Sequence, residues 1–439
     1  FVQPPPTELS LNIRPRRQPR SMLSALLLAP LSLSTRGARH APPRSCAAAA
    51  GAPDEAQLAL FASLRARSLE IEREVAERWR EAAPVSSVPV ALNDWIRRVA
   101  LDWPLAACGT ARGGLVLADL SSGDMLACAQ DAHPSVVDTP EVRSAMRELH
   151  GEYDGNGVLS VALCGSRVAS AGREGGVRLW RLDGDELVPT AELNVGALAS
   201  SLLLPAGEEG PLWASFLDGS LCRWSSLGGE EPSLVVSCSA AALAAACCAP
   251  LELVAAATSA GEVELFSTRD GSPRGCWAPP EVGSARSVAF VRGEEEGWSV
   301  VVGGADGSIH RRWLREAQAA GGEAAGGAAS VAAGFDEARE EEQFFPSHGG
   351  AVVGLAAAAA GLLVSGARDG TLRVWDLRRG AEERCLYGLG GYKVWLGSVC
   401  SDGARLVSDG CDNTLVLHDF SADARPDDDE IRRVGGREE

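Results

Sequence analysis

The chain has 439 residues, with 59 acidic against 41 basic side chains and a formal net charge of −18 at pH 7. This length exceeds one ordinary domain unless the domain is a repeat ring, and the 49 glycines and 24 prolines favour many short strands and turns. The acidic balance argues against nucleic-acid or anionic-membrane binding, and no apolar run is long enough to span a bilayer.

Cysteine and histidine spacing gives no sign of a bound metal or a disulfide framework. The twelve cysteines include no CxxC pair, and no two of the six histidines fall at helical i, i+4 spacing. We therefore expect small buried cysteines in a reducing compartment, no metal and no cofactor. The glycine-rich run 172–176 predicts a hairpin turn rather than a phosphate loop, and GxSxG is absent. The sequence thus indicates no catalytic residues and no enzyme.

The N-terminal segment 1–52 has the composition of a targeting sequence. Its first 50 residues hold seven arginines and a single acid, Glu8, and the apolar run Leu23–Leu33 precedes an acid-free Arg/Ser/Ala/Pro stretch. This order resembles the two-part plastid presequences of algae, so we expect a disordered, cleavable transit peptide and an organellar protein, in a plastid first. A mitochondrial or cytoplasmic location, a secretory signal, and a tail without targeting meaning are the alternatives.

Residues 53–84 predict one amphipathic helix. Asp54 and Gln57 have capping-box spacing, and Pro84 ends the pattern. Apolar residues recur on one face at helical steps: Phe61, Leu64, Ile71, Val75 and Trp79. We expect this face to pack on the domain that follows. Docking or self-association through 54–83 is the alternative.

A pattern of strand, tight turn and strand recurs along residues 85–425. Its best copy is 362–377, in which Asp369-Gly370 forms a strong hairpin signal and the second run ends at Trp375-Asp376. Seven copies follow one another: Leu105–Leu120, Arg167–Leu182, Leu212–Leu227, Leu253–Thr268, Val300–Leu314, Leu362–Leu377 and Arg405–Phe420.

The spacing of these copies predicts the fold. Positions equivalent to Trp375 are separated by 62, 44, 42, 46, 63 and 43 residues. About 40–45 residues make one four-stranded propeller blade, and the two longer gaps fit a blade plus an insertion. We therefore predict an all-β, seven-bladed β-propeller of four-stranded antiparallel blades over 85–425, with six or eight blades as alternatives. We expect Ser87–Leu92 to supply the outer strand of the last blade, with Ile431–Val434 as the alternative, and 426–439 to be an acidic flexible tail.

The insertions are 131–154, with a predicted helix Pro140–His150, and 316–347, which is Ala/Gly-rich and then acidic. Both precede the first strand of a blade. A partner-binding rim and tolerated loop growth are equally favoured for the first. For the second we expect a solvated, disordered tract, with a partner-binding rim as the alternative.

The repeat resembles the WD-repeat β-propeller family (beta-transducin-like repeats). The resemblance implies a structural relay of hydrogen bonds that locks the best blade, formed by His348, Ser365, Asp369 and Trp375. Other blades keep parts of it: Ser170, Glu174 and Trp180 in blade two (with Asp154 where the histidine would stand), Asp218 and Trp224 in blade three, Asp306 in blade five, and Ser408 and Asp412 in blade seven, where His418 replaces the Trp.

The resemblance also implies a noncatalytic scaffold or adaptor that binds protein partners through the face bearing the inter-blade loops. Arg173 and Arg368 in the tight turns, and Tyr392, Lys393 and Trp395 in the loop before blade seven, are the candidate partner-binding residues. A substrate receptor of a ubiquitin-type or protease machine, and a propeller enzyme with a site at the channel mouth, are the alternative functions.

Overall fold

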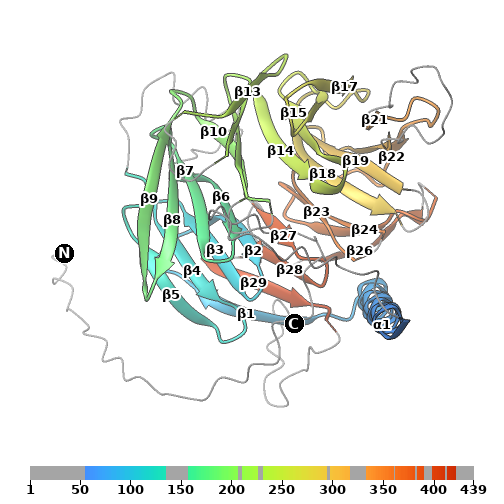
Figure 1. Cartoon of the computed structure of the whole chain (residues 1–439), viewed down its shortest axis with the longest axis horizontal. Coiled ribbons are helices and arrows are strands. Elements are labelled where there is room, and N and C mark those ends of the chain that lie inside the picture. The colour runs from blue at the N-terminus through green and yellow to red at the C-terminus, as the bar shows by residue number, and fades with distance from the viewer. Residues whose placement is uncertain are drawn as a thin grey trace, which may run out of the picture. The chain divides into compact units, whose positions relative to one another are not determined.

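The computed structural model describes residues 55–134, 157–205, 210–225, 231–293, 297–316, 333–359, 361–380, 383–389, 398–410 and 413–421 (Figure 1). The chain divides into two compact units, Phe1–Ala59 and Leu60–Glu439. Of the first unit only the helical residues 55–59 are described, and everything below concerns the second.

The described residues form seven antiparallel sheets, each of four strands, with one additional short strand in the fifth. The first strands of successive sheets contact one another around the whole set, and that of the last sheet contacts that of the first. The sheets therefore form a closed ring of blades (Figure 1). The predicted all-β class, the seven blades and the single N-terminal helix, α1 (Glu55–Arg80), are confirmed.

The strands of blades one to three, each from the inner to the outer edge, are β2 (Ile96–Asp102), β3 (Leu105–Thr110), β4 (Leu115–Asp119), β5 (Asp124–Ala129); β6 (Val158–Cys164), β7 (Arg167–Gly172), β8 (Gly176–Asp183), β9 (Glu186–Asn194); β10 (Ala199–Leu203), β11 (Leu212–Phe216), β12 (Ser220–Trp224), β13 (Leu234–Ser237).

Those of blades four to seven are β14 (Ala242–Cys248), β15 (Leu253–Thr258), β16 (Val263–Ser267), β17 (Pro273–Trp277); β18 (Ala285–Gly293), β19 (Gly297–Gly304), β20 (Ile309–Arg315), β21 (Gly334–Phe335) with β22 (Glu342–Gln343); β23 (Val352–Ala357), β24 (Leu362–Ala367), β25 (Leu372–Asp376), β26 (Cys385–Leu389); β27 (Val399–Ser401), β28 (Arg405–Asp409), β29 (Thr414–Asp419), β1 (Val85–Ala91). A 3₁₀ turn, η1 (Ala249–Leu251), joins β14 to β15.

The N-terminal strand closes the ring. β1 pairs antiparallel with β29, with Val85 opposite Asp419 and Ala91 opposite Thr414. The prediction that Ser87–Leu92 supplies this strand is confirmed. Pairing β1 with β29 joins the two ends of the propeller within one blade, and the ring leaves only the short outer strands of its blades as edges.

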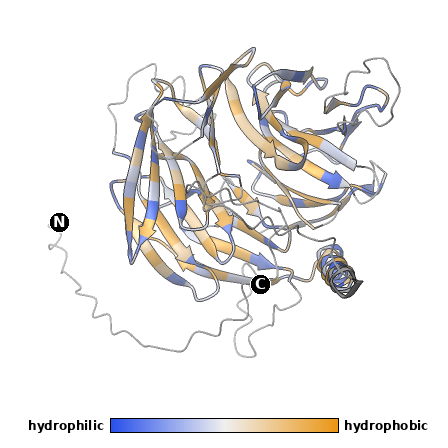
Figure 2. Cartoon of the chain, in the orientation of Figure 1, coloured by the Kyte–Doolittle hydropathy of each residue, from blue (hydrophilic) through white to orange (hydrophobic). Residues whose placement is uncertain are grey.

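In six of the seven blades the second strand is more buried than the outer one, and blade five is the exception because its short outer strand β21 is buried as well. Every residue of β11, β15 and β24 is buried, whereas half of the residues of β5 and most of those of β17 are exposed. A central strand has a neighbouring blade on both faces, so both its faces are apolar, as the hydropathy colouring of the strands shows (Figure 2).

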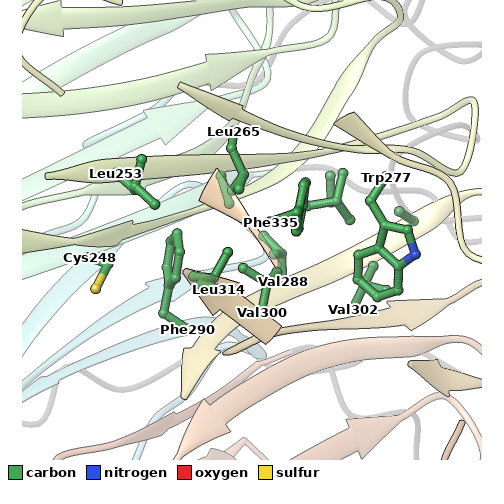
Figure 3. Packing of buried hydrophobic residues seen from close by; sticks show 14 of the residues in the cluster. Cys248, Leu253, Leu265, Trp277, Val288, Phe290, Val300, Val302, Leu314 and Phe335 are labelled. Carbon is green, nitrogen blue, oxygen red and sulfur yellow. The ribbon is translucent and has the colours of Figure 1, made fainter. Parts of the chain in front are cut away.

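The cores lie between blades. Between blades four and five, Leu253 and Leu265 face Val288 and Val300 (Figure 3). At the outer end of the same core the rings of Trp277 and Phe335 meet edge to face, with centroids 6.0 Å apart. Blade-to-blade packing of this kind makes each sheet depend on its two neighbours.

The second insertion is partly an ordered piece of blade five. β21 and β22 both pair with β20, and Phe335 and Phe344 are buried. Glu342 accepts an ion pair from the buried Arg384 at 2.8 Å. The expected disordered tract is therefore wrong for 333–347, because buried aromatic side chains and a paired glutamate hold this segment in place, whereas residues 337–340 within it are exposed to solvent as expected. Residues 317–332 lie outside the described part.

One backbone conformation recurs in the turn between the second and third strands of the blades. Six blades place a glycine with positive φ there, including Gly307 (φ 90°) and Gly370 (φ 76°). Blade seven uses Asn413 (φ 64°) instead. Glycine and asparagine tolerate this left-handed region, which explains why the copies share the residue although their other turn residues differ.

The last turns of α1 pack on the ring. Trp79 is fully buried, its ring stacks on Phe420 at 3.7 Å between centroids, and its Nε1 donates to the carbonyl of Gly403 at 3.0 Å. Leu64 and Leu69, nearer the start of α1, are about half exposed. Only the later part of the predicted apolar face is thus used against blades six and seven. No helix within the described ranges carries an apolar stretch long enough to cross a membrane.

Candidate functional site

The side chains of the predicted relay meet in blade six. His348 Nε2 lies 2.7 Å from Ser365 Oγ, which also accepts the indole N–H of Trp375 at 2.7 Å. His348 Nδ1 lies 3.1 Å from Asp369 Oδ2. His348 comes from the loop before β23, Ser365 from β24, Asp369 from the β24–β25 turn and Trp375 from β25. The chain of bonds therefore ties together four segments of one blade, and its role in stability stays a prediction.

Burial and residues outside the relay shift the pKa values of His348 and Asp369. Burial lowers the pKa of His348, and Arg373 lowers it further while Asp369 opposes the shift. Burial alone would raise the pKa of Asp369, but hydrogen bonds from Thr371 and from the backbone N–H of Gly349 outweigh it and lower the pKa. At neutral pH the network thus joins a neutral imidazole to a carboxylate that is already satisfied by other donors.

Blade two has a complete relay, with a histidine that the sequence reading missed. His133 Nε2 lies 2.7 Å from Ser170 Oγ, Trp180 donates to the same oxygen at 2.8 Å, and His133 Nδ1 contacts Glu174. We expected Asp154 in the histidine position, and that expectation is wrong. The 22 residues after Pro134 that precede the described start of blade two separate the histidine from β6. A search for a histidine just before the next strand therefore misses His133. The Ala-His-Pro run that follows blade one is the sequence signal that could have identified this residue.

Other blades keep single members of the relay in different local bonds. Asp218 and Asp306 each accept hydrogen bonds from the serine two residues on, Ser220 and Ser308, and so close their own turns. Trp224 is buried, and its Nε1 has no hydrogen-bond acceptor among the described residues, since Ala214 stands at the serine position.

In blade seven, the histidine at the tryptophan position contacts the strand that closes the ring. His418 Nδ1 lies 2.7 Å from the Oγ of Ser86 on β1. Burial lowers the pKa of His418 to about 4. Ser408 is fully buried on β28, and Asp412 lies outside the described residues. A histidine in the tryptophan position therefore joins the first and last strands of the ring.

The relay histidines and the tight turns lie at one end of the ring, here called the turn face. It comprises the turns between second and third strands and the loops that enter the first strands, which contact one another at His348–Asp369 and His133–Glu174. Of the predicted partner-binding residues, Arg173 is buried there and Arg368 is half-buried at the channel.

Three other predicted partner-binding residues, Tyr392, Lys393 and Trp395, lie outside the described residues, as does the expected helix Pro140–His150.

One exposed aromatic residue adjoins the blade-six relay on the turn face. Phe345 retains 45% of its exposure, whereas Phe344 beside it is buried, with its ring 5.5 Å from that of Trp375. Arg373 donates from Nη1 to the carbonyls of Pro346 and Ser347 at 2.6 and 3.0 Å. The buried ring of Phe344 and the hydrogen bonds from Arg373 thus hold the loop in place, while the ring of Phe345 is exposed. The two phenylalanines are neighbours before Pro346, and the sequence alone does not show which ring is buried.

Of the ten described cysteines, three are buried, five are half-buried and two are exposed. Ten are free thiols, and burial raises the pKa of Cys108 to about 12 and that of Cys247 to about 11. Cys128 and Cys276 are exposed, against expectation. Within the described ranges, no three His, Cys, Asp or Glu side chains gather closely enough to hold a metal ion.

Comparison with known proteins agrees with the repeat architecture described above. Residues 339–376 match the family described as WD domain, G-beta repeat, and this segment holds the complete blade-six relay. A 62-residue stretch is 45% identical to "Nuclear distribution protein PAC1-2" of Uncinocarpus reesii (strain UAMH 1704) and covers 14% of this chain and 13% of that protein. The chain thus has seven four-stranded blades in a closed ring, and its sixth blade contains a repeat that matches the WD40 family model.

Proposed function

We propose that the protein is a noncatalytic scaffold that binds a protein partner through the turn face, with the loop at Phe345 as its anchor. The observation that carries the proposal is the exposed ring of Phe345 on a loop whose backbone is held by Arg373. A large apolar ring presented from a fixed loop loses little conformational entropy on binding, and aromatic residues dominate the energetics of protein interfaces.

Two further points support this reading. WD40 propellers are typically protein-binding scaffolds, and the partly similar relative is named a nuclear distribution protein, a name that describes that protein alone. Arg373 holds the same loop, and Glu340, Glu341 and Glu342 precede it in the chain, so charges of both signs lie close to Phe345 in the chain or on its loop. An exposed apolar anchor favours a partner segment that presents an aliphatic or aromatic residue to it.

Affinity capture with matched variants tests the proposal. Full-length wild type, Phe345→Ser and Met125→Ser are used as baits in the same extract, because Met125 is an equally apolar, exposed residue on the outer strand β5, away from the turn face. We expect a specific set of proteins to be retained by wild type and Met125→Ser and lost with Phe345→Ser, at unchanged melting temperature for both variants. Equal retention by all three baits would refute the anchor.

A further inference from the structure

A long stretch of α1, residues 62–74, lies on the surface beyond the part of the helix that packs on the ring. Val75, Ala76 and Trp79 are buried, whereas every residue from 62 to 74 is exposed except the half-buried Ile71. At 1.5 Å per residue this stretch is about 20 Å long. The ring therefore covers only the C-terminal end of the helix.

Apolar side chains are among those that this stretch presents to solvent. Leu64 is 51% exposed and Leu69 is 52% exposed. Leu64 lies on the same face as Ile71 and Val75, whereas Leu69 lies about 140° away around the helix axis. Short helices without a packed apolar face are marginally stable in water, so the face of Leu64 is the one that gains most from a covering surface.

The charges of the stretch are divided between its two halves. Residues 62–67 carry Arg65 and Arg67 and no acidic residue, which gives a net charge of +2. Residues 69–74 carry three acidic residues and one basic residue, a net charge of −2: Glu70, Glu72, Arg73 and Glu74. Ser68 separates the halves, which therefore have equal length and opposite charge.

This pattern is complementary to itself in one orientation. Two copies that lie antiparallel place the basic half of each helix beside the acidic half of the other, whereas two parallel copies place like charges together. A two-fold axis at Ser68 also brings Leu64 of each copy close to the level of Ile71 of the other. A partner of uniform charge would match only one half of the stretch, so the charges favour a second copy of the chain.

From this pattern we infer that the chain forms a homodimer through an antiparallel contact between two copies of α1 residues 62–74. The helix is anchored at turns between first and second strands, since Ala359 packs in its core and Trp79 donates to Gly403. These turns lie at the end of the ring opposite the turn face. The dimer contact therefore leaves the partner surface at Phe345 uncovered and does not depend on it.

Sedimentation velocity of the full-length chain over a concentration series tests the contact. Wild type is compared with Arg65→Glu/Arg67→Glu and with a control, Arg181→Glu/Arg292→Glu, which reverses two exposed arginines on β8 and β18. We expect dimers of wild type and of the control. The α1 variant should dimerise at least about tenfold more weakly, because each reversal turns an attractive contact into a repulsive one twice in the symmetric pair.

A rescue variant separates loss of the contact from loss of folding. Adding Glu70→Arg/Glu72→Arg to the first variant exchanges the charges of the two halves, so the antiparallel homodimer should return. The rescued chain should not form hybrids with labelled wild type, because an antiparallel hybrid places like charges together. A parallel contact would give the reverse result, with hybrids preferred over both homodimers. Circular dichroism and melting curves establish that every variant is folded.

A second pair of variants tests the face of the helix. Leu64→Gln should weaken the dimer, whereas Leu69→Gln, at equal exposure on another face, should leave it unchanged. Several results would overturn the inference. They are a monomeric wild type at every concentration, an unchanged dimer after reversal of Arg65 and Arg67, no rescue by the exchanged charges, preferred hybrids, or a loss in Leu69→Gln as large as that in Leu64→Gln.

Discussion

Acidification should weaken the propeller through His418, the residue that joins the first and last strands. Its Nδ1 lies 2.7 Å from Ser86 Oγ, and burial lowers its pKa to about 4. In the unfolded chain a histidine has a pKa of about 6.5. Because the folded pKa is the lower one, protons bind preferentially to the unfolded state. The stabilisation is complete above pH ~6.5 and is lost as the pH falls toward the folded pKa.

The size of the effect follows from these two pKa values. A difference of roughly 2.5 units corresponds to about 3 kcal/mol when the titration is complete, at 1.36 kcal/mol per unit. Between pH 8 and pH 5 the linkage relation gives a loss of about 2 kcal/mol from this residue alone. That is a substantial part of the stability of an ordinary folded protein.

Urea unfolding of wild type and His418→Gln at pH 8 and pH 5 measures this loss of stability. Glutamine can keep a hydrogen bond to Ser86 but does not titrate, and all other groups titrate in both proteins. The free energy of unfolding of wild type should therefore fall by about 2 kcal/mol more than that of the variant. Equal losses in the two proteins would refute the argument that the buried imidazole is held neutral at the closing strand.

Three further predictions concern stability and are checked by urea unfolding at pH 7.5. Asp369→Ala should cost about 1–3 kcal/mol by leaving buried donors of the blade-six relay without an acceptor, and it should not change partner capture beyond the effect on folding; a variant that melts like wild type but loses the partner would contradict this structural role. Trp79→Ala should cost about 3–5 kcal/mol because a buried ring stacked on Phe420 is removed, and a cost below about 1 kcal/mol would mean that α1 does not stabilise the ring. Asn413→Gly should be close to neutral, whereas Asn413→Val should cost about 1–2 kcal/mol at φ 64°; equal effects of both would contradict the turn argument.

The relay shows which contacts can be predicted from residues close together in the sequence and which cannot. In blade six the His, Ser, Asp and Trp positions lie within 28 residues of one another, and the family resemblance implied the contacts that they make in the structure. In blade two the same geometry is reached by His133, which the chain separates from the blade by an insertion. Prediction from sequence spacing fails in blade two because hydrogen bonds depend on distance in space. The insertion increases the separation along the chain, but it does not change the distance between the side chains.

The segment 333–347 shows the limit of composition. Its charge predicts a solvated loop, yet Phe335 and Phe344 are buried and Glu342 pairs with a buried arginine from blade six. Burial of two rings outweighs the cost of ordering the loop, and the partner that neutralises the glutamate comes from another blade. Neither contact can be read from the segment itself.

The sequence by itself determined the repeat: the turn chemistry, the spacing of blades, their number and the strand that closes the ring, because each depends on a few residues close together in the chain. Only the tertiary structure decided which side chains from different blades meet. Arg98, Arg286 and Arg368 are far apart in sequence and carry no common motif, yet ring closure brings all three to one cavity. Phe345 and Phe344 are neighbours of the same type, and only packing against Trp375 decides which one faces solvent. The physical reason is that strand and turn formation are local, whereas burial and charge proximity are properties of the closed ring.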